Sequence, residues 1–122
     1  MRDKTYADKG RDLYAWERAK LFDTRTGAVY DNMNTKGRVT RWRFTYNQGT
    51  FIGAALRLYR WTDDKQYLDD AKLAGQFMRR RLCTDNGILK SEGQGDGGTF
   101  KLIGVRYIVE LAQLTQDQEL SD

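Results

Sequence analysis

The sequence predicts an all-α fold of antiparallel helices, with two long connections that have some β character. Apolar side chains recur at helical spacing over four segments, and a turn of four residues joins two of those segments. The chain has 122 residues, of which 39% are hydrophobic and 31% are charged. This length and composition favour one soluble globular domain over residues 1–122.

The first expected helix covers about residues 5–22, and the second covers about residues 47–61. The apolar positions of the first helix include Tyr6, Leu13, Trp16, Ala19 and Leu21. In the second helix, apolar residues three and four positions apart form a stripe on one face. The stripe of the second helix consists of Phe51, Ile52, Ala55, Leu56 and Tyr59.

The third expected helix covers about residues 65–82, and the fourth covers about residues 99–114. The apolar positions of the third are Tyr67, Ala71, Ala74 and Met78, flanked by Leu68 and Phe77. Those of the fourth are Phe100, Ile103, Tyr107, Leu111 and Leu114. Only "TDDK" separates the second helix from the third, so these two should pack as an antiparallel hairpin.

Long connections precede the second and fourth helices. Residues 23–45 contain two short stretches of β character, 28–30 and 39–44, around the turn-rich "DNMNTKG". The other connection, residues 83–98, is rich in glycine, and loops of more than about 12 residues are usually functional or disordered. Because alternate helices of an antiparallel stack run the same way, both helices should open at one rim. We therefore expect Tyr46–Gln48 to lie near Asp96–Lys101.

The charge pattern argues against a nucleic-acid partner. The net charge is +4, but the 21 basic residues are interleaved with 17 acidic ones. The densest basic run, Arg79–Arg81, falls near a predicted helix C-terminus, where the helix dipole stabilises cations. This run is therefore either a solvated helix end or an anion-binding site. A second run, "KGRVTRWRF", mixes bases with aromatic residues, as both single-strand binders and amphipathic loop strands do.

Missing residue types exclude several classes of chemistry. Histidine is absent and Cys83 is the single cysteine, which excludes Ser-His-Asp and Cys-His catalysis, an internal disulfide and the usual zinc spacings. We expect no metal and no cofactor. No apolar run approaches the roughly 18 residues that span a bilayer, so we expect no membrane partner. The first residues contain no apolar segment typical of a secretory signal, and the compartment stays open.

Two stretches resemble a known family. They are "FTYNQGTFIGAALRLYRWTDDKQYLDDA" and "GGTFKLIGVRYIVELA". Together they resemble glycoside hydrolase family 76, the α-1,6-mannanase family. Its members carry a Tyr-Asn-Gln-Gly helix start, and a Phe-Lys-Gly stretch that leads through three apolar residues to Arg-Tyr. The upstream "LFDTRTGAVYDNM" is similar to that family as well, so the resemblance covers about residues 12–115. Leu102 departs from the pattern, since the family favours glycine there.

The resemblance implies part of an (α/α)6 toroid, a ring of helical hairpins with a carbohydrate cleft at one end. It also implies retaining hydrolysis of α-1,6-linked mannan by two neighbouring aspartates. A complete ring needs far more helix than 122 residues provide, so the chain resembles only the later-middle third of such an enzyme. The family's aspartate pair lies upstream in a Trp-rich segment. Asp63-Asp64 and Asp69-Asp70 do not match that context, so the catalytic residues are unknown.

Tyr46, Asn47 and Gln48 are candidate substrate-binding residues. Amide side chains offer both a donor and an acceptor, as a sugar hydroxyl requires. Asn47 has an alternative role as the N-cap of the second helix, and Tyr46 has one as a hydrophobic staple. The same two alternatives, core packing or sugar stacking, apply to the aromatic residues Trp42, Phe44 and Trp61.

The fourth helix and the loop before it supply the other candidates. The resemblance favours a cleft role for Lys101 and Arg106, although the residues by themselves are ordinary helix charges. Asp96, within "GQGDGG", either contacts a sugar or caps the fourth helix. Asp31 lies in a turn, where an Asx-turn is the more common role.

These observations support two hypotheses. In the first, the chain is a fragment of a hydrolase that acts on α-1,6-linked mannan and is inactive by itself. In the second, it is a non-catalytic helical module for carbohydrate binding or assembly. Both name α-mannan or a mannooligosaccharide as partner. Both also allow self-association, because part of a ring exposes apolar helix faces.

Overall fold

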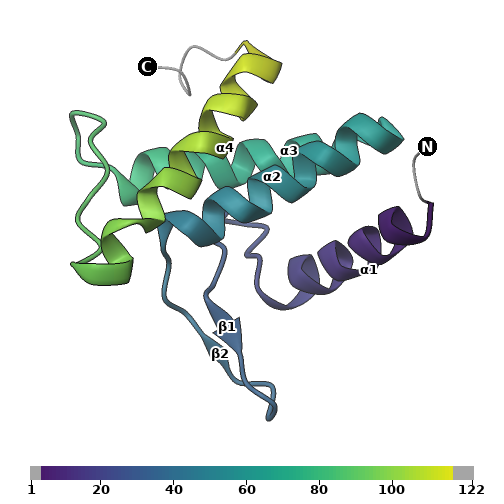
Figure 1. The fold of residues 1–122 in the computed structure, drawn as a ribbon, viewed down its shortest axis with the longest axis horizontal. Helices are drawn as coiled ribbons and strands as arrows, with labels where there is room; N and C mark the ends of the chain where they lie inside the picture. The colour runs from purple at the N-terminus through teal and green to yellow at the C-terminus, as the bar shows by residue number, and fades with distance from the viewer. Residues whose placement is uncertain (1–3, 117–122) are drawn as a thin grey trace.

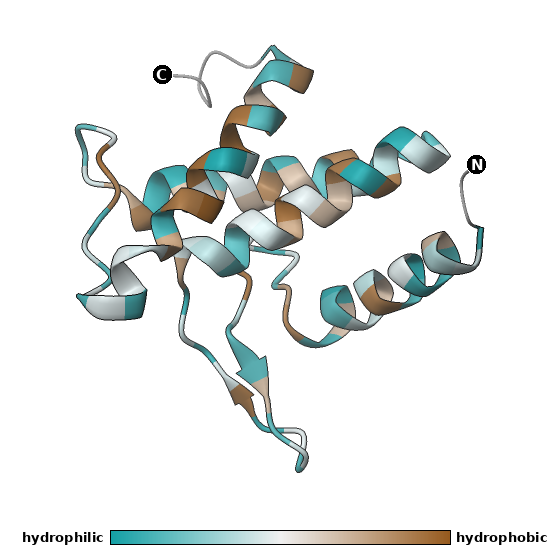
Figure 2. Ribbon diagram, viewed as in Figure 1, coloured by the Kyte–Doolittle hydropathy of each residue, from teal (hydrophilic) through white to brown (hydrophobic). Residues whose placement is uncertain are grey.

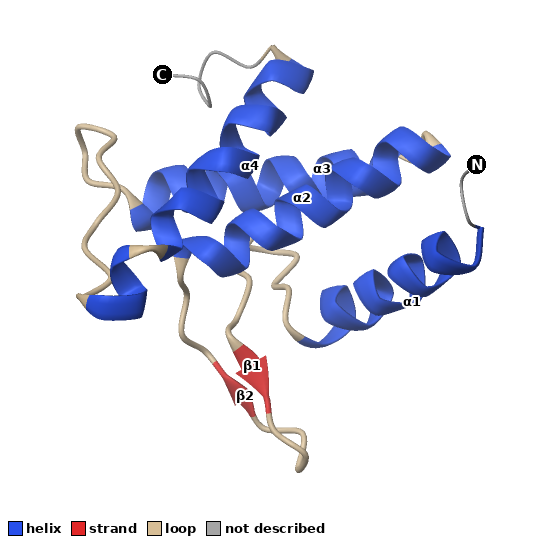
Figure 3. Cartoon of the chain, in the orientation of Figure 1, coloured by secondary structure: helices blue, strands red, loops and turns tan. Residues whose placement is uncertain are grey.

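The computed structural model describes residues 4–116, so the predicted domain limits, residues 1 and 122, lie outside the described part. Its regular elements are α1 (Lys4–Lys20), β1 (Asn32–Met33), β2 (Val39–Thr40), α2 (Thr45–Thr62), α3 (Lys65–Phe77), η1 (Met78–Leu82), η2 (Gly95–Gly98) and α4 (Phe100–Thr115). Helices dominate, as the sequence predicted (Figure 3). The two short strands pair antiparallel and form a hairpin that projects from the helices (Figure 1).

Helix α2 is the centre of the fold and packs against both α3 and α4 (Figure 1). Four of the five residues of its predicted apolar stripe are fully buried, namely Phe51, Ile52, Ala55 and Leu56, and the fifth, Tyr59, is half-buried. Phe51 stacks on Phe22 at a centroid distance of 4.4 Å and on Tyr14 at 5.0 Å. Residues of α1 and of the loop after it therefore share the core of the α2–α3 hairpin.

The α2–α3 hairpin is closed by two aspartates. Asp63 ends α2 in the left-handed region, at φ 59°, and its N–H donates to the carbonyl oxygen of Tyr59. Asp64 then caps α3, where its side chain accepts a hydrogen bond from the N–H of Gln66. These turn roles explain why the short "TDDK" connection suffices.

A buried carboxylate joins α1 to α3. Asp70 accepts hydrogen bonds from Tyr14 Oη at 2.9 Å and from Arg18 Nε and Nη2 at 2.6 and 3.1 Å. Burial, and then the neighbouring Asp70 charge, raise the pKa of Tyr14 above its ordinary value. Tyr14 therefore stays a neutral donor, and the network fixes α1 on the hairpin.

Helices α2 and α4 approach closely because glycines face each other at the crossing. A Cβ placed on Gly49 would lie 2.7 Å from the Ile103 carbonyl oxygen and 2.9 Å from the Gly104 Cα. A Cβ on Gly104 would lie 2.9 Å from the Cβ of Thr45. Both glycines lie in the first turns of their helices, so α2 and α4 begin side by side.

Several predicted boundaries differ from the observed ones. Helix α2 begins at Thr45, two residues earlier than expected, and α3 gives way to the π-helical turn η1 before the expected end. Within the β-prone stretch 28–30, Val29 forms an isolated bridge with Phe22, while the hairpin strands lie at 32–33 and 39–40. Among residues 4–116, no helix is long and apolar enough to cross a membrane.

Candidate functional site

The adjoining N-terminal ends of α2 and α4 form an aromatic and polar surface. We call it the α2–α4 rim and define it by Asp31, Phe44, Tyr46, Asn47 and Phe100. The ring of Phe100 lies 4.6 Å from that of Tyr46 and 5.3 Å from that of Phe44, measured between centroids. The start of α2 with its cap residue Phe44 and the start of α4 therefore meet at one end of the molecule.

Asp31 is the polar centre of the rim. Its Oδ1 accepts hydrogen bonds from Tyr46 Oη and, at 3.4 Å, from Asn47 Nδ2. Its Oδ2 accepts a hydrogen bond from Asn32 Nδ2 at 2.8 Å. Burial, and then the bond to Asp31, raise the pKa of Tyr46, so the phenol remains protonated and donates. The expected Asx-turn is not what the carboxylate of Asp31 forms within the described residues, because its hydrogen bonds go to side chains of β1 and α2 and join the β-hairpin to α2.

Asn47 leaves one acceptor unused. The residue is buried, and its Oδ1 has no hydrogen-bond partner within residues 4–116. Buried polar atoms are nearly always paired in proteins, so this oxygen lacks a hydrogen bond that such an atom normally has. It has almost no exposed surface, so a ligand donor reaches it only if neighbouring side chains move. A sugar hydroxyl is a donor of that kind, and it also accepts.

Gln48 has a structural role, which replaces the expected sugar contact. Its side chain is fully buried, and its Oε1 accepts a hydrogen bond from the N–H of Val29 at 2.5 Å. Its Nε2 donates to the carbonyl oxygens of Gly27 and Ala74, at 2.9 and 3.1 Å. Both ends of the amide are thus bonded to backbone of the loop after α1 and of α3. Gln48 joins three segments, and we leave it out of the binding residues.

Glu92 caps α2, a role that sequence reasoning missed. Its two carboxylate oxygens accept hydrogen bonds from Thr45 N and Thr45 Oγ1, both at 2.5 Å. The alternative role of Asn47 as N-cap was therefore wrong, since Asn47 lies inside the first turn and Phe44 occupies the cap position without a side-chain bond. No local pattern marks Glu92, because it lies 47 positions away along the chain.

The other sequence candidates surround the start of α4. Lys101 Nζ donates to the carbonyl oxygen of Leu89 at 3.4 Å, which ties α4 to the glycine-rich loop. Asp96 is exposed in η2; its carbonyl oxygen, not its side chain, accepts from Thr99. Arg106 is exposed further along α4, and its guanidinium lies 5.4 Å from the centroid of the Tyr107 ring.

The candidate stacking residues separate into two groups. Trp42 is 65% exposed and meets Phe44 edge-on at a centroid distance of 6.0 Å, which places it beside the rim. Trp61 packs against the core near the opposite end of α2, about 22 Å along the helix axis from Tyr46 at 1.5 Å per residue. Trp42 and Phe44 therefore remain stacking candidates, whereas Trp61 does not.

The described residues offer no metal site. No three His, Cys, Asp or Glu side chains within residues 4–116 lie together as metal ligands do. The rim contributes one carboxylate, Asp31, and it is engaged by Tyr46 and Asn47. The side chains of the rim are of the types that can hydrogen-bond hydroxyl groups and stack on sugar rings.

Comparison with known proteins identifies the family of this chain. The sequence profile of glycosyl hydrolase family 76 matches residues 1–121. A solved α-1,6-mannanase of that family from Salegentibacter sp. HEL1_6, an inactive double-aspartate variant in complex with α-1,6-mannotetraose, is 42% identical with a TM-score of 0.84. The match covers 91% of this chain and 34% of that one. No curated protein matches the sequence significantly.

Two further structures extend the comparison. The Lin0763 protein from Listeria innocua is 37% identical with a TM-score of 0.90, over 97% of this chain and 34% of that one. A family 76 α-mannanase from Bacteroides thetaiotaomicron has the same fold at 20% identity, with a TM-score of 0.80 over 97% of this chain and 32% of that one. This chain thus spans about a third of each structure and forms part of their (α/α)6 fold. It belongs to glycosyl hydrolase family 76.

Proposed function

We propose that this chain supplies one wall of an α-1,6-mannan-binding cleft in a retaining family 76 hydrolase. Tyr46, Asn47, Asp96, Lys101 and Arg106 contribute to that wall. The observation that carries the proposal is the meeting of α2 and α4 at the rim, where Asp31, Tyr46 and the unpaired Asn47 oxygen adjoin aromatic rings. A related α-1,6-mannanase, 42% identical, has been solved with α-1,6-mannotetraose, which supports the choice of ligand.

The catalytic step itself belongs outside these residues. Retaining hydrolysis needs two carboxyl groups about 5–5.5 Å apart, one as nucleophile and one as acid and base. Asp63 and Asp64 are turn and cap residues, and Asp70 is buried under Tyr14 and Arg18. Each of these carboxylates already has a structural task. We therefore expect the 122-residue chain to bind mannan without cleaving it.

A fluorescence titration tests the binding. Trp42 lies beside the rim, so α-1,6-mannotetraose should change the tryptophan emission of the chain. Tyr46→Phe removes the hydroxyl and keeps the ring, and it should weaken binding by roughly 5–10-fold, as expected for about 1 kcal/mol from one hydrogen bond. Tyr59→Phe, on the same helix but beyond the rim, is the matched control and should bind as the wild type does. An emission spectrum that stays constant up to millimolar sugar would refute the proposal.

A hydrolysis assay tests the division of labour. Incubation of the purified chain with α-1,6-mannan should release no reducing sugar. Release that disappears when an aspartate within residues 4–116 is changed to asparagine would show that the catalytic pair lies here after all.

The apolar face of α4 favours a second function, assembly. Leu102, Val105 and Val109 are three and four positions apart, so they lie on one side of α4, and they are 73%, 45% and 46% exposed. Figure 2 shows that much of the α4 ribbon is hydrophobic. Exposed apolar clusters of this kind usually mark contact with another protein surface. As a non-catalytic module, the chain would dock this face on a further helical hairpin or on a second copy of itself.

A further inference from the structure

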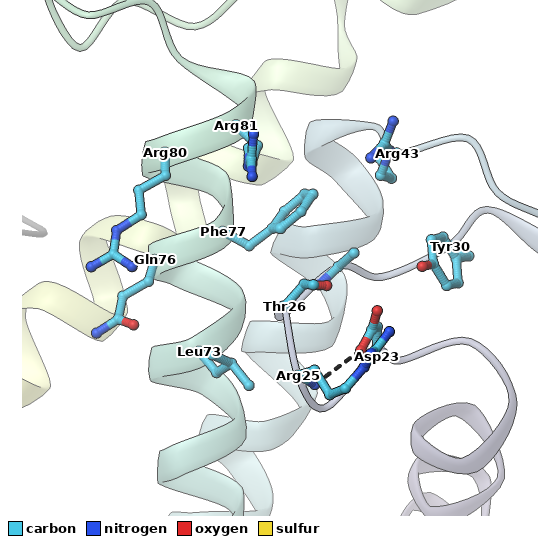
Figure 4. Close-up of a pocket in the computed structure, with 11 residues that line it drawn as sticks. Asp23, Arg25, Thr26, Tyr30, Arg43, Leu73, Gln76, Phe77, Arg80 and Arg81 are labelled. Atoms are coloured by element: carbon cyan, nitrogen blue, oxygen red, sulfur yellow. Dashed lines mark hydrogen bonds and ion pairs between the residues drawn. The ribbon is translucent and has the colours of Figure 1, made fainter.

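Two basic segments that are distant in the sequence meet beside the rim. One pocket of about 520 Å³ lies between the loop after α1 and the end of α3, and Arg25, Arg43, Arg80 and Arg81 line it (Figure 4). A second pocket of about 640 Å³ is lined by Arg41, Arg43, Arg81 and Lys90. The two share Arg43, Phe77 and Arg81, so we treat them as one surface and call it the arginine groove.

Positive charge in the arginine groove far exceeds the negative charge. Asp23 is the one carboxylate among its lining residues. The backbone N–H of Arg25 donates to Asp23 at 2.9 Å and lowers its pKa, and the Arg25 side chain lies 3.8 Å away. Asp23 is therefore ionised, and its charge is already paired with that of Arg25. Arg43 and Arg81 take part in no ion pair within the described residues.

A solvated helix end does not explain this arrangement. Arg80 and Arg81 lie at the C-terminus of η1, where the helix dipole favours cations by about 0.3–1 kcal/mol. Lys90 comes from another segment and caps this helix end, since its Nζ donates to the carbonyl oxygen of Arg81 at 3.0 Å. Arg43 comes from the segment before α2, which is not part of that helix end. Like charges gathered in a groove repel one another, and such grooves concentrate anions. The residues that line the arginine groove all belong to this chain, so the groove forms without the rest of a toroid.

The groove is continuous with the rim. Phe44 lines the second pocket, and its ring stacks on Tyr46 at a centroid distance of 6.0 Å. A glycan that occupies the rim therefore has the groove beside it. The volumes fall within the roughly 300–1,000 Å³ of small-molecule sites, and guanidinium groups bind phosphate and sulfate through paired hydrogen bonds.

We propose that the arginine groove binds oxyanion substituents, phosphate or sulfate esters, on the α-mannan held at the rim. The substrate class is then an acidic mannan. This inference rests on the proposed function, because it takes the rim as the place of the mannan backbone. Arg43 and Arg81 contact the ester, and Phe77 forms the apolar floor between them.

The test compares charged and neutral glycans on the 122-residue chain. The probes are α-1,6-mannan bearing phosphate monoesters, the same mannan bearing sulfate esters, the unmodified mannan, phosphorylated dextran, inorganic phosphate and single-stranded DNA. Binding to each is measured by affinity electrophoresis at 0.15 M salt. Arg43→Ala/Arg81→Ala is compared with Lys36→Ala/Lys65→Ala, which removes the same charge from exposed positions elsewhere. Circular dichroism confirms that both variants are folded.

The expected result is tenfold or tighter binding of an esterified mannan over the unmodified one. That gain should vanish in Arg43→Ala/Arg81→Ala and persist in the lysine control. The phosphate and sulfate arms then identify the ester. Equal binding of esterified and unmodified mannan would overturn the inference and leave the proposed function standing. Phosphorylated dextran, free phosphate or DNA binding as tightly as esterified mannan would also overturn it, since the groove would then be a general anion site. Failure of the unmodified mannan to bind at any concentration would instead overturn the proposed function.

Discussion

Substitution of Gly49 by alanine tests the close contact that brings the two helix starts together. The added Cβ would lie 2.7 Å from the Ile103 carbonyl oxygen and 2.9 Å from the Gly104 Cα, both backbone atoms of α4 that no rotamer change can move. Overpacking typically costs 1–3 kcal/mol, and alanine regains at most about 1 kcal/mol of helix propensity. We expect Gly49→Ala to lower the free energy of unfolding by about 2 kcal/mol. Urea unfolding followed by circular dichroism measures this difference.

Gly10→Ala is the matched control. Gly10 lies on the exposed face of α1, and a Cβ there would meet nothing within 4 Å. The same chemical change should therefore stabilise the chain by about 0.5–1 kcal/mol. If Gly49→Ala were as stable as Gly10→Ala, the α2–α4 contact would not be the tight one described, and the geometry of the rim would be wrong.

Three further predictions follow from other contacts. Glu92→Ala should lower the free energy of unfolding by about 1–2 kcal/mol in urea, because Thr45 loses its cap, and an unchanged midpoint would contradict the capping role. Burial raises the pKa of Glu17, so the charged carboxylate destabilises the fold at neutral pH. Glu17→Gln should therefore be more stable than the wild type at pH 7. This advantage should fade as the pH falls and the wild-type carboxyl group becomes protonated. An equal advantage at pH 3 and pH 7 would rule out this cause. In sedimentation velocity, the chain should form oligomers that Leu102→Glu/Val109→Glu disperses, whereas a wild-type monomer at high concentration would contradict the assembly role of α4.

Helices α2 and α3 were predictable because most of their apolar stripe is also the core. The apolar positions expected for the first and fourth helices were largely wrong as core residues, since Tyr6, Leu13 and Ile103 are 72%, 66% and 39% exposed and α1 buries Tyr14 instead. Phe51, Ile52 and Leu56 are wholly buried, and the spacing that identified them depends on local geometry alone. The "TDDK" turn was predictable for the same reason, since Asp63 and Asp64 act on their own neighbours. The prediction that the second and fourth helices begin at the same end of the molecule followed from the alternating directions of antiparallel helices.

The roles of the polar residues depended on contacts between distant segments. Gln48 and Asn47 are adjacent amides in the first turn of α2, yet Gln48 is bonded at both ends while the Asn47 oxygen is unpaired. The start of α2 was placed two residues late because Glu92 caps it from another loop. The sequence predicted only a turn role for Asp31, because its hydrogen-bond partner Tyr46 lies 15 positions further along the chain and no local pattern connects the two. Only the tertiary fold decides which of these side chains keeps an unused hydrogen-bonding atom.

An amide-resolved NMR titration with α-1,6-mannotetraose tests the central proposal most directly. The proposal predicts saturable shifts of the amide signals of Asp31, Tyr46, Asn47 and Lys101, on one common binding curve. It predicts no comparable shifts near Trp61, at the other end of α2. Shifts confined to the Trp61 end, or an absence of shifts at millimolar sugar, would contradict the assignment of the α2–α4 rim as a mannan-binding surface.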